Sequence, residues 1–198
     1  VIQAGLERSG SATDEVVSLK LQDFGFRGAT SPESAALGGA AHLVNFRGSD
    51  TLAACELLME YYAADMPGVS IPAAEHSTIT VWGEEAEGDA FQHILRQYPE
   101  GLVSVVSDSW DVLRACKELW GTRLKTDIQQ RQGCVVVRPD SGPPEAVVPD
   151  CLDTLGEQFG YTLNSKGYRV LPETIRLIQG DGIRRQTLAG IVDAILAR

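Results

Sequence analysis

The amino-acid sequence predicts an α/β fold built from βαβ units around a parallel sheet. Short runs rich in β-branched residues alternate with segments of helical periodicity along the 198 residues. Several of the strand-like runs are continuously apolar, as expected of strands that are buried on both faces. An Asp, Arg or His lies at or near the end of each run, which indicates a functional edge.

The composition is that of an ordinary globular domain, with 43% apolar and 22% charged residues. No apolar run reaches the roughly 20 residues that a membrane-spanning helix needs, and no signal peptide pattern opens the chain. We therefore expect a cytoplasmic protein. The formal net charge of −10 argues against nucleic acid or an anionic membrane as partner. A phosphorylated substrate would need arginines gathered at its binding position.

The expected strands are the apolar, β-branched runs, which are Val16–Leu21, Ala41–Asn45, Ser77–Val81, Leu102–Val106, Cys134–Val137 and Ile175–Ile178. One expected helix begins at Ser31-Pro32. The other expected helices are the periodic segments Ser49–Tyr62, Asp89–Tyr98, Ser109–Trp120, Glu145–Phe159 and Thr187–Arg198. Ser31 is a capping residue before a proline at the first helical position, and Gly121 and Gly160 are expected helix ends. Thr162–Pro172 is expected to be a surface loop. No linker divides the segment, so residues 1–198 are expected to act together.

The four cysteines form no C-x-x-C pair, and each lies in an apolar or helical run. We expect buried free thiols in a reducing compartment and no zinc site, because no Cys and His cluster has ligand spacing.

Polar side chains follow the predicted strands, in the runs Asp23–Gly28, Arg47–Asp50, Ser107–Ser109, Arg138–Gly142 and Gln179–Gly182, and Glu75-His76 precedes another. In an α/β barrel such strand ends lie on one face, and in an open doubly wound sheet they lie along one edge. Either arrangement predicts that these side chains line one site.

Each of these residues also has a structural interpretation. Asp50 can cap one helix and either Asp108 or Ser109 the next, and Asp140 and Gly180-Asp181-Gly182 can belong to turns. His76 can be a structural histidine, and Phe24 can be a core residue. Arg138 is harder to explain structurally, because an Arg directly after Val-Val-Val indicates an anionic partner.

Seven runs, in order along the chain, resemble the nicotinamide phosphoribosyltransferase family. They are Leu21–Gly28, His42–Thr51, Pro72–Thr78, Val105–Ser109, Arg138–Gly142, Asn164–Tyr168 and Ile178–Gly182. The resemblance implies a type II phosphoribosyltransferase fold, which is an irregular α/β barrel with an added domain, incomplete in this segment, and a homodimer. It also implies that 1–198 is a single catalytic segment of a longer chain. The partner-subunit aromatic of the family would lie upstream of Val1, and its glycine-rich phosphate loop downstream of Arg198.

The resemblance implies a role for each matching residue. Phe24 matches the aromatic that stacks on the pyridine ring, and Asp50 matches the acid that bonds the carboxamide. The groups on the diphosphate side are Arg27, His76 and Arg138, and the ribose and nucleotide contacts are Asp140, Gly180 and Asp181. Pro139 is a further substrate-binding residue. The implied catalytic residues are His76, Asp140 and Asp108, and His76 also matches the histidine that ATP phosphorylates.

The implied reaction transfers the phosphoribosyl group of phosphoribosyl pyrophosphate to nicotinamide, with Mg²⁺ accompanying the pyrophosphate and no metal site of the protein's own. The ring nitrogen already carries a lone pair, so no general base is needed, in agreement with the absence of a Ser-His-Asp or Cys-His pattern. The carboxylate of Asp50 would repel an acid substrate, which disfavours the nicotinate and quinolinate alternatives. A non-catalytic nucleotide-binding protein of the same fold is the other alternative.

Overall fold

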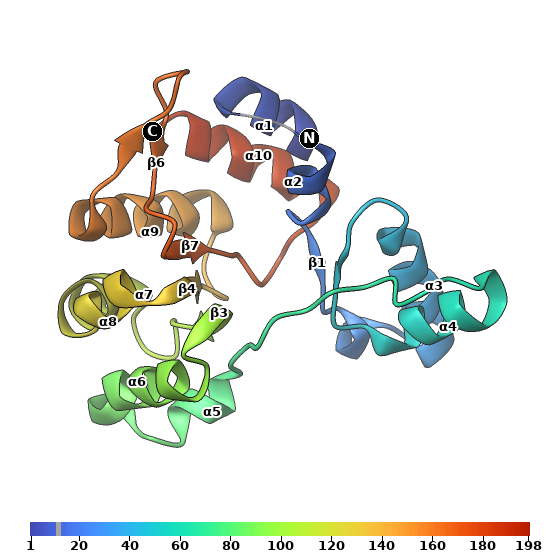
Figure 1. The fold of residues 1–198 in the computed structure, drawn as a ribbon, viewed down its shortest axis with the longest axis horizontal. Helices are drawn as coiled ribbons and strands as arrows, with labels where there is room; N and C mark the ends of the chain where they lie inside the picture. Colours follow the sequence, from blue (N-terminus) through green and yellow to red (C-terminus); the bar gives the residue numbers. More distant parts are fainter. Residues whose placement is uncertain (11–12) are drawn as a thin grey trace. The chain divides into compact units, whose positions relative to one another are not determined.

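The computed structural model describes residues 1–10 and 13–198 as a mixture of helices and short parallel sheets (Figure 1). The chain forms two compact units, Ile2–Ser70 and Ile71–Arg198, the second of which includes Val1. Both units mix helices with parallel strands, which confirms the predicted α/β class. Within the described residues the sheets do not close into a barrel. That residues 1–198 act as one catalytic segment stays a prediction.

The unit Ile71–Arg198 is built on a three-stranded parallel sheet in the order β3-β4-β7. These strands are β3 (Glu100–Val106), β4 (Gln132–Arg138) and β7 (Ile175–Leu177), and they confirm three of the predicted strands. The register pairs Val106 with Arg138, so β3 and β4 end side by side. Val103–Val106 of β3, Val135–Val137 of β4 and Ile175 of β7 are buried, because helices cover both faces of the sheet, whereas Leu102 near the start of β3 is exposed.

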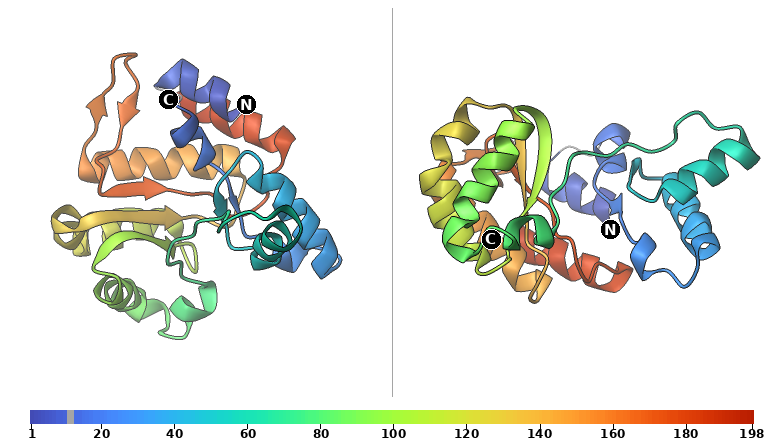
Figure 2. Two further views of the ribbon diagram at one scale, coloured as in Figure 1. Left: turned by 45° about the vertical axis from the view of Figure 1, so that its right-hand side comes forward. Right: turned by 90° about the horizontal axis from the view of Figure 1, so that it is seen from below.

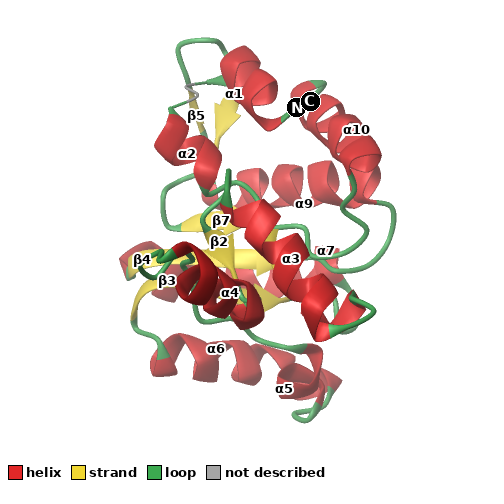
Figure 3. Cartoon of the chain, turned by 90° about the vertical axis from the view of Figure 1, so that its right-hand side faces the viewer, coloured by secondary structure: helices red, strands yellow, loops and turns green. Residues whose placement is uncertain are grey.

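The helices of this unit are α5 (His76–Thr80), α6 (Glu87–Gln97), α7 (Val112–Arg114), the π-helical segment η3 (Ala115–Arg123), α8 (Lys125–Gln130), α9 (Pro144–Phe159) and α10 (Arg185–Leu196), with the 3-10 turn η2 (Glu84–Ala86). Helices α6 and α9 lie on opposite sides of the sheet in the views of Figures 1 and 3. Phe91 of α6 and Trp120 of η3 stack in the core with ring centroids 4.3 Å apart, and both are completely buried. This aromatic pair joins α6 to the segment that follows β3.

A buried ion pair also joins α6 to α7. Nη2 of Arg114 donates to Oε2 of Glu87 at 2.8 Å, and Glu87 is completely buried. Burial raises the pKa of Glu87 from its ordinary 4.5 to about 7, although the Arg114 charge opposes the rise. Oε1 of Glu87 has no hydrogen-bond partner among the described residues.

The unit Ile2–Ser70 contains a smaller parallel pair, β1 (Gln22–Asp23) and β2 (Gly48–Ser49), in which Gln22 pairs with Gly48. Its helices are α1 (Ile2–Ser9), α2 (Asp14–Ser18), α3 (Pro32–Leu43) and α4 (Leu52–Tyr62), with the 3-10 turn η1 (Phe26–Gly28). Helices α3 and α4 pack closely because small residues face each other. A Cβ on Gly39 would lie only 2.6 Å from the Cβ of Ala54.

Three strand predictions are wrong, and the local hydrogen bonds explain why. The first half of Val16–Leu21 belongs to α2, because the Thr13 hydroxyl accepts a hydrogen bond from the Val16 N–H at 3.3 Å and caps a helix there. Ala41–Asn45 instead covers the end of α3, which begins at the predicted cap Ser31 and runs on through alanines of high helix propensity.

The third wrong strand, Ser77–Val81, is helix α5. The Thr78 hydroxyl donates to the carbonyl of Glu75 at 2.7 Å, which supports a helical turn. Ile79 is completely buried, so this helix places its apolar residue in the core as a strand would have done.

The predicted helices are confirmed with shifted ends. The segment predicted as Ser109–Trp120 is divided between α7 and η3 and continues past Gly121 to Arg123. Gly121 does not end it and is instead a packing position against α9, where a Cβ would be 2.4 Å from the Gln158 Cγ. The predicted loop Thr162–Pro172 is instead a short antiparallel hairpin of β5 (Thr162–Leu163) and β6 (Arg169–Val170) (Figure 2).

All four cysteines are buried free thiols, as predicted. Contact with Cys151 and burial raise the pKa of the Cys116 thiol, and burial raises that of Cys134. Across residues 1–10 and 13–198, no helix has the length and apolar character needed to cross a membrane.

Candidate functional site

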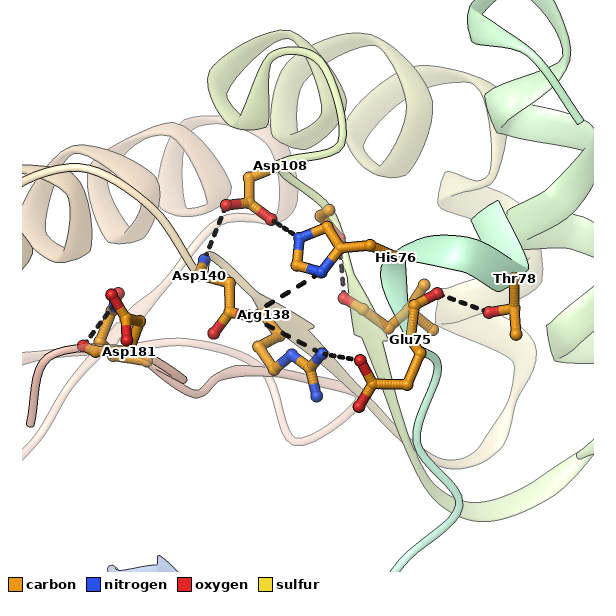
Figure 4. Close-up of polar contacts among 10 residues, drawn as sticks. Glu75, His76, Thr78, Asp108, Arg138, Asp140 and Asp181 are labelled. Carbon is orange, nitrogen blue, oxygen red and sulfur yellow. Dashed lines mark hydrogen bonds and ion pairs between the residues drawn. The ribbon is translucent and has the colours of Figure 1, made fainter. Parts of the chain in front are cut away.

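A cluster of charged side chains lies where β3 and β4 end, within the unit Ile71–Arg198 (Figure 4). We call it the His76 cluster, and its members are Glu75, His76, Asp108, Arg138 and Asp140. The backbone joins the two strand ends, since the N–H of Ser107 donates to the carbonyl of Arg138 at 2.9 Å. The parallel register therefore brings together Asp108 and Asp140, which are 32 positions apart in the sequence. A parallel bridge between Ala73 and Ser104 of β3 places His76 near them.

Asp108 organises the cluster through both of its carboxylate oxygens. Oδ1 lies 3.0 Å from Nε2 of His76, and Oδ2 accepts a hydrogen bond from the Asp140 N–H at 3.0 Å. The other ring nitrogen of His76, Nδ1, lies 3.9 Å from Oδ2 of Asp140. The side chain of Asp108 is only 4% exposed, whereas that of His76 is 40% exposed. The buried Asp108 carboxylate thus orients the imidazole of His76, while another part of the ring is open to solvent.

Arg138 is a buried cation whose carboxylate neighbours are all distant. Its side chain is 9% exposed, and Nη2 lies 3.9 Å from Oε2 of Glu75 and 4.0 Å from Oδ2 of Asp140. Its Nε has no hydrogen-bond partner among residues 1–10 and 13–198. Buried guanidinium groups are normally closely paired, so this arrangement can accept an additional anion.

The pKa of Asp140 is raised above its ordinary value, chiefly by burial. The negative charges of Asp108 and Asp181 add to the rise, while Arg138 and His76 oppose it. The negative charges of Asp108, Asp140 and Asp181 therefore lie close together at the ends of the strands. Such a group of carboxylates favours the binding of a cation or of a hydroxyl group that donates a hydrogen bond.

Gly180 follows β7 and lies against Asp140. Its N–H donates to the carbonyl of Pro139 at 3.2 Å. A Cβ at this position would be 2.0 Å from Oδ1 of Asp140 and 3.2 Å from Cδ of Arg138. Only glycine therefore leaves room for the Asp140 carboxylate where it lies. Asp181, the next residue, is exposed, and its carbonyl accepts a hydrogen bond from Nε2 of Gln179 at 3.2 Å.

The loop that carries Asp108 is held from the core. Nε1 of the buried Trp120 donates to the Ser107 hydroxyl at 3.1 Å, and that hydroxyl donates to the Val105 carbonyl at 2.9 Å. These bonds connect the η3 segment to the residue before Asp108, so they limit movement of the Asp108 carboxylate.

The unit Ile2–Ser70 carries the other three candidates near the ends of its own parallel strands. Asp50 directly follows β2, and its N–H donates to the carbonyl of Asp23 at 2.7 Å. Phe24, which is half-buried, follows Asp23, and Arg27 is exposed in the 3-10 turn η1. The side chain of Asp50 is exposed and accepts a hydrogen bond from the Ser70 hydroxyl.

Comparison with known proteins gives the family. The model of the nicotinate phosphoribosyltransferase (NAPRTase) family matches residues 19–198, which is nearly the whole chain. The chain belongs to this family. This confirms the resemblance that the seven sequence runs indicated.

Bacterial proteins named nicotinamide phosphoribosyltransferase are similar to nearly the whole of this chain. The chain is 50% identical to the one from Xanthomonas campestris pv. campestris over 199 residues, which cover 100% of this chain and 42% of the relative. It is 36% identical to that of Acinetobacter baylyi, covering 96% of this chain and 42% of the relative. It is 32% identical to that of Mycoplasma pneumoniae, covering 98% and 44%. The chain therefore spans less than half the length of these relatives.

The family's strand-end pattern was visible in the sequence, and the structure brings His76, Asp108, Arg138, Pro139, Asp140 and Gly180 together with Asp181 beside them. That Phe24, Arg27 and Asp50 share one site with these residues stays a prediction. Sequence reasoning missed Glu75 as a neighbour of Arg138, although its place beside His76 was a signal. It also missed Ser70, whose hydroxyl meets Asp50 across 20 residues with no local motif to indicate it.

Proposed function

We propose that the protein containing this chain transfers the phosphoribosyl group of phosphoribosyl pyrophosphate to nicotinamide, giving nicotinamide mononucleotide and pyrophosphate. The names of the relatives support the reaction. The observation that carries it in the structure is the buried, loosely paired Arg138 beside His76 and three carboxylates. Such a set suits a substrate that carries both phosphate charge and a ribose.

Arg138 would bind the diphosphate. A phosphate group would replace the carboxylates that now lie 3.9 and 4.0 Å away as the close partner of its guanidinium. The fork of an arginine matches two phosphate oxygens at once, and a charge-assisted pair of this kind is strong when little exposed. Arg27 and the exposed edge of His76 would contribute to the same side of the substrate, as the family resemblance implies. The leaving pyrophosphate gains negative charge, which these groups neutralise.

Asp140 would accept hydrogen bonds from the ribose, with Gly180 and Asp181 beside it. Hydrogen bonds from ribose hydroxyls would favour the ionised carboxylate of Asp140 and so oppose the rise that burial causes in its pKa. The sugar develops positive charge as the bond to pyrophosphate breaks, and nearby carboxylates stabilise that charge. No group of three or more His, Cys, Asp and Glu side chains within the described ranges can hold a metal ion unaided. Mg²⁺ fits here as a companion of the diphosphate, with Asp108 or Asp140 as its protein ligand, and would offset the phosphate charge.

The chain supplies positioning and electrostatics in this proposal. The pyridine nitrogen of nicotinamide is neutral and has its lone pair ready, so no side chain has to remove a proton. Phe24 would stack on the ring, and the carboxylate of Asp50 would accept a hydrogen bond from the carboxamide nitrogen. The same carboxylate would repel nicotinate, by roughly 4 kcal/mol at ~4 Å and an effective dielectric near 20.

His76 would accept a phosphoryl group from ATP. Its Nε2 is occupied by Asp108 at 3.0 Å, which leaves the Nδ1 lone pair as the nucleophile. In that step the Nδ1–P bond forms, the bond from the γ-phosphorus to the bridging oxygen breaks, and ADP leaves. The homodimer that the resemblance implies and the cytoplasmic location expected from the sequence belong to the same proposal.

Nicotinate is the second candidate substrate, since the matching family bears its name. The test is pyrophosphate release by the full gene product with phosphoribosyl pyrophosphate, Mg²⁺ and ATP, and with nicotinamide, nicotinate or quinolinate in turn. We expect release that depends on nicotinamide and is lost in Arg138→Ala. Pyrophosphate release that depends on none of nicotinamide, nicotinate and quinolinate would overturn the proposal. Unchanged release by the Arg138→Ala variant would show that Arg138 does not bind the diphosphate.

A further inference from the structure

The carboxylate of Asp50 has one partner that the proposed reaction does not explain. The Ser70 hydroxyl donates to Oδ1 of Asp50, and both residues belong to the unit Ile2–Ser70. Asp50 is exposed, and an exposed carboxylate on two rotatable bonds would otherwise sample several orientations. The hydrogen bond from Ser70 therefore restricts the orientation of the Asp50 carboxylate, and this restriction calls for an explanation.

The backbone holds Ser70 in place beside β2. Val69, the preceding residue, forms a parallel bridge with Gly48. The Ser49 N–H donates to the Val69 carbonyl at 3.0 Å, and the Val69 N–H donates to the Arg47 carbonyl at 2.8 Å. Ser70, the residue after Val69, thus lies beside the end of β2. Asp50 is the residue that directly follows β2. Two backbone hydrogen bonds therefore hold Val69, the residue directly before Ser70, against β2.

The backbone of Asp50 is held from the opposite side. Its N–H donates to the Asp23 carbonyl at 2.7 Å, at the end of the paired strand β1. The backbone is therefore fixed through β1 and the carboxylate through Ser70. With Oδ1 taken, Oδ2 is left as the oxygen that can receive a ligand.

From these contacts we infer that Ser70 is a positioning residue for pyridine selection, which holds Oδ1 of Asp50 so that Oδ2 accepts the carboxamide N–H. This inference rests on the proposed function and adds to it a residue that touches no reacting atom. Holding the side chain before the ligand arrives removes an ordering cost worth about a 2- to 12-fold change in affinity. Its signature is a change in the KM for nicotinamide with little change in kcat, because the contact is equal in the ground state and the transition state.

The test uses the full gene product and four variants, Ser70→Ala, Ser70→Thr, Asp50→Ala and the double variant Ser70→Ala/Asp50→Ala. Ser70→Ala should raise the KM for nicotinamide by about 2- to 12-fold. Ser70→Thr keeps a hydroxyl and should restore the wild-type KM. In the Asp50→Ala background, Ser70→Ala should have no further effect, since the carboxylate through which it acts is gone.

Ser18→Ala is the matched control. It lies in the same unit and also loses one hydroxyl, which donates to the Glu15 carbonyl at 2.8 Å, and it should leave the KM unchanged. If Ser70→Ala lowers the unfolding temperature, Ser70→Cys replaces it, because a thiol of similar size is a weak donor and should raise the KM in the same direction.

Two results would overturn the role of Ser70. One is an equal KM change in the wild-type and Asp50→Ala backgrounds, and the other is a folded Ser70→Thr variant that behaves like Ser70→Ala. Failure of the proposed function is distinguishable from both, because the wild-type protein would then turn over no nicotinamide at all.

Discussion

Replacing Gly180 by alanine tests how closely the position of Asp140 is controlled. The added Cβ would lie 2.0 Å from Oδ1 of Asp140, whereas contacts below 3.0 Å do not persist. The carboxylate must therefore move by at least about 1 Å, and a misplacement of that size can lower a rate by about 100-fold. The φ angle of Gly180 is not in the left-handed region, so the backbone itself tolerates alanine.

The movement would also change the contacts of Asp140 with its neighbours. Its Oδ2 now lies 3.9 Å from Nδ1 of His76 and 4.0 Å from Nη2 of Arg138. We expect kcat/KM for phosphoribosyl pyrophosphate to fall by about 10- to 100-fold, with a destabilisation of roughly 1–3 kcal/mol from the added methyl group. The measurements are steady-state kinetics and urea unfolding of the full gene product.

The matched control is Gly38→Ala. Gly38 lies in α3, and a Cβ there meets nothing within 4 Å. This variant should keep its activity and gain about 0.4–1 kcal/mol of stability. In an Asp140→Ala background, Gly180→Ala should lower kcat/KM no further. A folded Gly180→Ala protein with wild-type kcat/KM would refute the reasoning.

Asp50→Asn should lower the preference for nicotinamide over nicotinate by about 1–3 kcal/mol in the ratio of kcat/KM values, since the repulsion of the acid disappears; an unchanged ratio would make Asp50 a structural residue. His76→Ala should abolish transfer of labelled phosphate from γ-labelled ATP to the protein, and label retained in this variant would place the phosphoryl acceptor elsewhere. Glu87 has a folded-state pKa of about 7 against an ordinary 4.5, so it favours folding while protonated and loses that contribution as pH rises from 4.5 to 7. Over this interval the free energy of unfolding of wild type should fall by roughly 2 kcal/mol more than that of Glu87→Gln, measured by urea unfolding at the two pH values. Equal pH dependence in both proteins would contradict a buried titration at Glu87.

The larger sheet was predictable because its strands carry a strong signal. Continuous β-branched runs such as Val135–Val137 have few other ways to be buried, and both their type and their position were predicted correctly. The strands β1 and β2 have two residues each, and a two-residue strand has no periodicity to detect. The apolar runs beside them were therefore assigned as strands, although Thr13 and Ser31 cap helices there.

Asp108, Arg138, Asp140 and Asp181 were predictable because they closely follow predicted strands, whereas Glu75 was missed. What the sequence could not show is how they are held. The tight contact of Gly180 with Asp140 depends on β7 pairing next to β4, and the donation from Ser70 to Asp50 depends on a bridge at Val69. Both are consequences of tertiary pairing and have no local sequence signature.

The most direct test of the proposed function is a competition between the two pyridine substrates. The full gene product is given equal concentrations of nicotinamide and nicotinate with limiting phosphoribosyl pyrophosphate, Mg²⁺ and ATP, and the two mononucleotides are quantified by chromatography. The account predicts nicotinamide mononucleotide in more than about tenfold excess, from even half of the repulsion at Asp50. An excess of nicotinate mononucleotide, or neither product, would contradict it.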